Sequence, residues 1–89
     1  MDDIIEASIE TPDGIADCNF EPLENDGLLY YNVTILYPNT VNGYSRPEVY
    51  CHNMYKDDAG HYHFDQMDEN IHPKIKKLEG LLSDIITSG

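Results

Sequence analysis

The chain has 89 residues, 40% of them hydrophobic and 25% charged, which suits one small domain and excludes a multidomain enzyme with a deep cofactor cleft. Seventeen acidic residues against five basic ones give a formal net charge of −12, which repels nucleic-acid backbones and anionic lipid surfaces. No apolar run approaches the roughly 18 residues that span a bilayer, and the acidic start is unlike a basic secretory signal. We therefore expect a single cytoplasmic domain over residues 1–89 that binds neither nucleic acid directly nor membranes.

The first two predicted elements are strands with one polar face each. Hydrophobic residues occupy every second position, which is typical of a half-buried strand. These positions are Ile5, Ala7, Ile9, Ala16, Cys18 and Phe20. Between them, Pro12 and Gly14 predict a tight turn. If the turn loop holds two or four residues, both hydrophobic sets fall on one face, so the pattern predicts an antiparallel hairpin.

A central strand is predicted over residues 28–37. Pro22 is expected to end the strand before it, and residues 24–27 form a second predicted turn. One face of the central strand carries Leu29, Tyr31, Val33, Ile35 and Tyr37, and the other carries Leu28, Tyr30 and Leu36. A strand that is apolar on both faces belongs in the middle of a sheet. These residues are therefore expected at the centre of the fold.

A long loop and a last hairpin follow. Residues 38–47 begin and end with proline and are predicted to form the loop. The hairpin is predicted over residues 48–67, with its turn at residues 57–60. Its core face is expected to carry Tyr50, His52, Met54, Tyr62, Phe64 and Gln66. Its opposite face is expected to carry Cys51, Asn53, Tyr55, His61, His63 and Asp65.

The C-terminal segment changes its hydrophobic period from two to three or four residues. The apolar positions are Ile71, Ile75, Leu78, Leu81, Leu82, Ile85 and Ile86. This spacing predicts an amphipathic helix over residues of about 72–87, with Pro73 in its first turn. The sequence as a whole predicts an α+β fold. In that fold an antiparallel β-meander of four to five strands, over residues of about 3–67, carries one C-terminal amphipathic helix packed on one face.

The nearest approach to a chemical site is a set of weak metal-ligand candidates in the last hairpin. His61 and His63 are two residues apart on a predicted strand and point the same way, and Cys51 or Asp65 is a candidate third ligand. Two histidines at this spacing are also common on a solvated sheet face near a turn. We therefore favour no metal site and expect no cofactor.

The sequence contains no pattern typical of an enzyme active site. Its serines lie outside any G-x-S-x-G context, and no glycine-rich phosphate loop is present. Cys18 and Cys51 are too few for a disulfide framework, and no partner histidine and acid can be assigned to either. We therefore predict reduced thiols and no catalytic activity.

Four residues are predicted to contact a protein partner. One helix covers only one face of a sheet, so Tyr30 and Leu36 on the other face of the central strand remain available. Tyr44 and Arg46 lie in the long loop and are residue types that are common at interfaces. The predicted function is therefore a protein–protein interaction module, and a second copy of the chain is one candidate partner.

Two other functions are compatible with the composition. The acidic surface also suits an inhibitor that imitates nucleic acid and occupies a basic nucleic-acid-binding protein, which requires carboxylates in two rows at phosphate-like spacing. The second alternative is a small metal-binding protein that uses the hairpin of residues 51–65.

Overall fold

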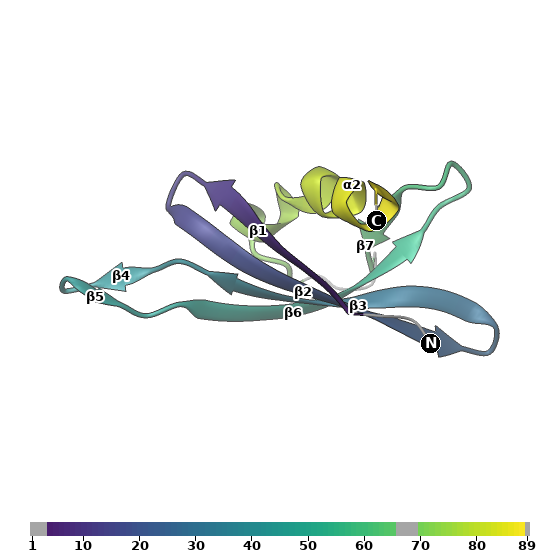
Figure 1. The fold of residues 1–89 in the computed structure, drawn as a ribbon, viewed down its shortest axis with the longest axis horizontal. Coiled ribbons are helices and arrows are strands. Elements are labelled where there is room, and N and C mark those ends of the chain that lie inside the picture. Colours follow the sequence, from purple (N-terminus) through teal and green to yellow (C-terminus); the bar gives the residue numbers. More distant parts are fainter. Residues whose placement is uncertain (1–3, 66–69, 89) are drawn as a thin grey trace.

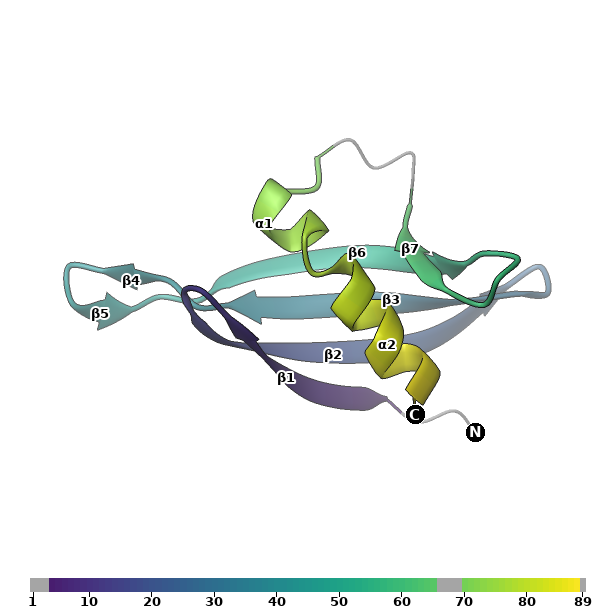
Figure 2. The ribbon, with the colours of Figure 1, turned by 90° about the horizontal axis from the view of Figure 1, so that it is seen from above.

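The computed structural model describes residues 4–65 and 70–88 of the chain. A five-stranded antiparallel sheet forms one layer, and a C-terminal helix lies across one of its faces (Figure 1). The strands follow one another across the sheet in chain order (Figure 2). They are β1 (Ile5–Thr11), β2 (Gly14–Asn25), β3 (Leu28–Tyr37), β6 (Glu48–Lys56) and β7 (Tyr62–Phe64). The arrangement confirms the predicted α+β class, an antiparallel meander with a C-terminal helix.

The first hairpin has the register that the alternating pattern predicts. Thr11 pairs with Gly14 across a two-residue loop, and Ile5 therefore stands opposite Phe20. Thr11 Oγ1 donates to the Gly14 carbonyl at 2.8 Å and accepts the Asp13 N–H at 3.1 Å, so one side chain closes the turn from both sides. The hydrophobic residues of both strands thus share the face that the helix covers.

The sequence pattern predicts that Pro22 ends the second strand, and the structure shows that this prediction is wrong. β2 continues through Pro22 to Asn25, and Pro22 pairs with Tyr31 of β3. The described part of β1 begins at Ile5, opposite Phe20, so Pro22 lies beyond the β1–β2 pairing. A proline costs no ladder hydrogen bond on the unpaired side of a strand, and the sheet tolerates it there.

The predicted loop over residues 38–47 is instead a projecting hairpin. β4 (Thr40–Val41) pairs with β5 (Tyr44–Ser45), and the two extend beyond the end of the main sheet (Figure 1). Asn42 and Gly43 form the turn with φ of 53° and 80°, the two positive values that a type I′ turn requires. We call residues 40–45 the arm. An Asn-Gly pair between strand-forming residues is a strong hairpin signal that sequence reasoning overlooked.

The C-terminal helix is divided into two segments rather than continuous. α1 (Pro73–Lys76) is a single turn, and α2 (Glu79–Ser88) follows it. The Leu78 N–H bonds to the Ile75 carbonyl at 2.9 Å, a tighter three-residue step, before the regular pattern resumes with Leu82 bonded to Leu78. Ile75, Leu78 and Leu82 are all buried, so the tightened step keeps the apolar side chains of both segments in the core.

The core lies between the helix and one face of the sheet. Its buried hydrophobic residues are Ile9, Ala16, Cys18, Phe20, Val33, Ile35, Tyr37, Met54, Tyr62, Phe64, Ile75, Leu78, Leu82 and Ile86. The strand members of this set are those that the period of two assigned to the covered face. The predicted strand end at Gln66 and Met67 lies outside the described residues, as do residues 1–3.

Candidate interaction surface

The sheet face that points away from α2 carries no covering layer in the described part of the chain (Figure 1). We call it the open face. Alternate residues of β1, β2, β3 and β6 project from it, because successive side chains of a strand point to opposite faces. It has three regions along the strands: an apolar cluster, a polar middle and a tyrosine pair.

The apolar cluster consists of Ile15, Leu36 and Val49. Leu36 pairs with Val49 of β6 on one side and with Asp17 of β2 on the other. Ile15 is two residues from Asp17 and so is a diagonal neighbour of Leu36. The exposed fractions of Ile15, Leu36 and Val49 are 54%, 39% and 64%. Three large apolar side chains therefore face solvent together near the base of the arm.

The polar middle of the open face is a hydrogen-bonded network. Asn32 Nδ2 donates to Asn53 Oδ1 at 2.9 Å across the β3–β6 pair. The Cys51 thiol lies 3.4 Å from Asn32 Oδ1 and donates to it, and Thr34 Oγ1 is 3.8 Å from Cys51 Sγ. Because these polar groups bond to one another, they hold fixed positions between the two apolar ends of the face.

The tyrosine pair lies beyond the polar middle. Tyr30 and Tyr55 pair across β3 and β6, and their rings stack with centroids 5.1 Å apart and planes 24° apart. Leu23 of β2 pairs with Tyr30 from the other side. This end of the open face is half-buried by its own side chains, so it offers less free apolar surface than the cluster around Leu36.

Acidic side chains occupy the β1–β2 half of the open face. They are Glu6 and Glu10 on β1 and Asp17 and Glu21 on β2. β1, β2 and β3 contain no lysine, arginine or histidine. Ser8 Oγ donates to Asp17 Oδ1 at 2.8 Å, which orients that carboxylate beside the apolar cluster. The open face therefore combines exposed apolar side chains with negative charge.

The four predicted partner-binding residues occupy three separate places. Tyr30 and Leu36 both lie on the open face, but six residues of strand, about 20 Å, separate them. Tyr44 and Arg46 lie on and just after the arm, and Tyr44 is 75% exposed. The end of β3 that leads into the arm holds Leu36, and the opposite end of β3, which holds Tyr30, lies at the other end of the sheet. Figure 2 shows β3 running between these two ends.

Sequence reasoning did not single out Ile15 and Val49 as contact residues. Both occupy the phase opposite to the buried residues of their strands, since Ile15 precedes the buried Ala16 and Val49 precedes the half-buried Tyr50. The sequence signal for both residues is an apolar side chain at a solvent-facing position of a strand. Applied to every predicted strand, this criterion selects Ile15 and Val49 together with Leu36.

The structure does not bring the four weak metal-ligand candidates together. His63 stands opposite Tyr55, whereas Cys51 lies four residues away from Tyr55 along β6, about 13 Å by strand rise. His61 is exposed just before β7, and Asp65 follows its end. Within residues 4–65 and 70–88, no three histidine, cysteine or acidic side chains are placed to hold a metal ion.

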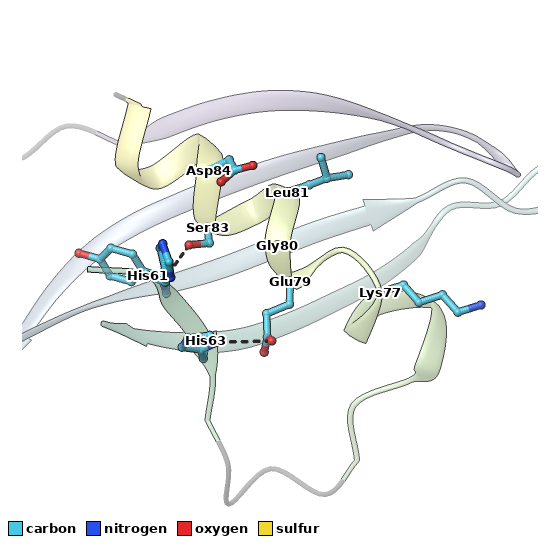
Figure 3. Close-up of a pocket in the computed structure, with 9 residues that line it drawn as sticks. His61, His63, Lys77, Glu79, Gly80, Leu81, Ser83 and Asp84 are labelled. Carbon is cyan, nitrogen blue, oxygen red and sulfur yellow. Dashed lines mark hydrogen bonds and ion pairs between the residues drawn. The ribbon is translucent and has the colours of Figure 1, made fainter. Parts of the chain in front are cut away.

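His63 and Glu79 line a shallow groove between β7 and α2 and belong to a charged cluster (Figure 3). His63 Nε2 is 2.6 Å from Asp57 Oδ2, and its Nδ1 is 3.5 Å from Glu79 Oε1. The hydrogen bond to Asp57 raises the pKa of His63 against the opposing effect of burial, and Glu79 adds to the rise. Burial raises the pKa of Glu79, but the Phe64 N–H, Lys76 and His63 outweigh it and leave that pKa lowered. Both ring nitrogens of His63 are therefore held by carboxylates of the chain itself.

Comparison with known proteins gives no relative from which a function follows, so a function is argued from the fold and the open face. No family model, curated protein or solved structure matches the chain. Among the described residues, α1 and α2 are both too short to cross a membrane.

Proposed function

We propose that the chain is a non-catalytic protein–protein interaction module whose open face binds a partner that carries basic residues around an apolar contact. The apolar cluster beside the acidic β1–β2 half is the observation that carries this proposal. Exposed apolar side chains that gather on one surface mark contact sites more often than isolated ones do. The adjacent carboxylates define the charge of the partner.

The two parts of this surface contribute differently to binding. Burial of the exposed parts of Ile15, Leu36 and Val49 contributes on the order of 1 kcal/mol each. The carboxylates raise the association rate and exclude acidic partners more than they add affinity. Binding is therefore expected to weaken as salt screens the carboxylates, while part of it persists through the apolar cluster.

A second copy of the chain fits this surface less well than a basic protein does. The strands β1, β2 and β3 of a second copy bring no lysine or arginine to face the carboxylates. Two acidic surfaces brought together repel each other, and that repulsion opposes the gain from apolar contact. Self-association remains the alternative, and the hydrodynamic measurement below tests it.

We favour this function over imitation of nucleic acid because the carboxylates of the open face are sparse. Glu6 and Glu10 are four residues apart on β1, and Asp17 and Glu21 are four apart on β2, which is about 13 Å of strand. Double-stranded DNA carries one charge per roughly 3.4 Å of axis in each strand. The rows on the open face are several times less dense than that.

Affinity capture with matched variants tests the proposal. The immobilised chain is exposed to cell extract at low and at high salt, alongside Val49→Lys and the control Leu29→Lys. Leu29 is 44% exposed and belongs to the opposite phase of β3, so the control adds the same charge away from the open face. Basic proteins that bind at low salt to the original chain and to Leu29→Lys, and are lost with Val49→Lys, support the proposal.

Two results would contradict the proposal. Retention of the same proteins by Val49→Lys and by the original chain would exclude the open face from the interaction. Sedimentation at tens of micromolar that shows a dimer, which Val49→Lys dissociates, would make a second copy the partner. Circular dichroism of each variant checks that the fold is intact.

A further inference from the structure

The two edges of the sheet differ in their hydrogen bonds to the helix α2. At the β7 edge, the Tyr62 N–H donates to Ser83 Oγ at 2.8 Å, and the Phe64 N–H donates to Glu79 Oε2 at 2.9 Å. The two donors are two residues apart on a strand, about 6.6 Å, and the two acceptors are four apart on a helix, about 6.0 Å. Because these spacings match, α2 caps the β7 edge.

The opposite edge, β1, has no such cap among the described residues. Alternate residues of an edge strand direct their N–H and C=O groups away from the neighbouring strand, where another strand can pair with them. Figure 2 shows α2 crossing the sheet from the β7 side toward β1. A groove of about 450 Å³ separates α2 from the edge of β1, with residues 8–10 on one wall and Leu81, Asp84 and Ile85 on the other.

The groove offers an apolar contact. Leu81 belongs to the hydrophobic period of the helix and was expected in its buried arc, but it is 49% exposed and faces this groove. Ile85 beside it is half-buried, and Ile9 closes the floor from β1. A leucine and an isoleucine one turn apart on a helix form a continuous apolar strip. The strip lies beside the open edge of β1.

The charge around the groove has one sign. Asp84 on α2 and Glu10 on β1 both line it and are exposed, Asp84 on the helix side and Glu10 with its side chain on the opposite face of the strand, and no lysine or arginine lines it. A segment that enters the groove therefore gains from basic side chains at its margins and apolar side chains toward α2. In an extended segment, alternate side chains point to opposite sides, so one strand can meet both requirements.

We propose that this groove binds an extended segment of a partner protein, which adds to the sheet as a strand beside β1. Its main chain pairs with the edge of β1, its alternate apolar side chains contact Leu81 and Ile85 on the α2 side, and its intervening lysines or arginines point to the other side of the sheet, where Glu10 lies. This site differs from the apolar cluster of the open face, because its main-chain and apolar contacts lie at the sheet edge under α2 and only Glu10 belongs to both surfaces. It therefore goes beyond the proposed function.

A designed peptide tests the proposal directly. The probe is a fluorescein-labelled heptapeptide of alternating lysine and valine, and its binding to the full chain is followed by fluorescence anisotropy. We expect saturable binding that Leu81→Gln weakens about tenfold, the effect of losing one leucine contact. Leu29→Gln removes a similarly exposed leucine outside the groove and should leave the affinity unchanged.

Three further measurements separate strand addition from general attraction between opposite charges. N-methyl groups at alternate residues remove the N–H donors from one edge of an extended peptide. Two peptides are therefore compared, one methylated at the odd positions and one at the even positions, and only the peptide methylated on the side that faces β1 should lose binding. A peptide of alternating glutamate and valine should not bind. Nuclear magnetic resonance should place the largest amide shifts of the chain on β1 and α2.

Several outcomes would overturn the proposal. They are an absence of binding, binding that Leu81→Gln leaves unchanged, and binding that both N-methylated peptides retain. If Val49→Lys abolishes binding and Leu81→Gln retains it, the peptide binds the open face and not the groove. That last result would leave the proposed function standing and remove only the groove.

Discussion

The backbone N–H of Tyr62 donates to the hydroxyl of Ser83, 21 residues further along the chain, over 2.8 Å. Ser83 is the one buried polar side chain among residues 4–65 and 70–88. The bond joins the last strand of the sheet to the middle of α2 and is itself buried. It orients the helix relative to the sheet, whereas the surrounding apolar contacts favour burial without specifying direction.

Replacement of Ser83 by alanine is therefore expected to destabilise the fold. Ser83→Ala leaves the Tyr62 N–H buried without its acceptor, which costs about 1–3 kcal/mol. Urea unfolding should show a lower midpoint with an unchanged slope. Ser88→Ala, in the exposed last turn of the same helix, is the control and should change the midpoint little. Equal effects of the two substitutions would contradict a role for the buried bond.

The pair of His63 and Asp57 predicts a pH dependence of stability. The hydrogen bond to Asp57 raises the pKa of His63 above its ordinary 6.5, so the stabilisation is complete below pH 6.5 and is lost as the pH rises through the raised value. The pKa of Asp57 is lowered below its ordinary 3.8, chiefly by the His61 N–H and then by the His63 ring. The stabilisation from Asp57 is complete above its ordinary pKa of 3.8 and is lost as the pH falls through the lowered pKa.

These two groups stabilise the fold together between about pH 4 and 6.5. Thermal unfolding should therefore show a melting temperature that declines above pH 6.5, and His63→Gln should reduce that decline. The control is His61→Gln, because the His61 side chain is exposed beside the same groove. Parallel pH profiles for the original chain and His63→Gln would count against the ion pair.

Gly80 in the first turns of α2 offers a stabilising substitution. A Cβ added at Gly80 meets no atom within 4 Å, and the backbone there has an ordinary helical φ. Gly80→Ala is expected to stabilise the fold by about 1 kcal/mol, the difference in helix propensity. Gly27→Ala is the comparison, because its φ of +80° strains any side chain and should lower stability. A decrease on both substitutions in urea unfolding would show that Gly80 has a role other than chain flexibility.

The two cysteines should differ in reactivity. Cys18 is 2% exposed, and burial, with a smaller contribution from Asp17, raises its pKa to about 11. Cys51 lies exposed on the open face. An aromatic disulfide reagent should therefore modify one thiol per folded chain quickly, and the second only after denaturant is added. Cys51→Ser should abolish the fast reaction, and a fast phase of two thiols would contradict the burial of Cys18.

The period of two predicted much of the sheet because it depends on local geometry. A strand turns successive side chains to opposite faces wherever it lies, so the phase of Ile5, Ala7 and Ile9 already determines which face they share with Phe20. The same reasoning selected Leu36 and Tyr30 as residues of the uncovered face. The prolines at the two ends of residues 38–47 favour a loop there, so this reasoning does not predict the arm, which depends on the Asn42-Gly43 turn.

The sequence by itself determined the strand faces, the first register and the amphipathic tail, since each follows from the spacing of neighbouring residues. The tertiary structure alone decided which sheet edge α2 caps, why Leu81 faces a groove rather than the core, and that Ser83 accepts a bond from Tyr62. Those features depend on the angle at which α2 crosses the sheet. That angle results from the packing of side chains distant in sequence, which no local period encodes.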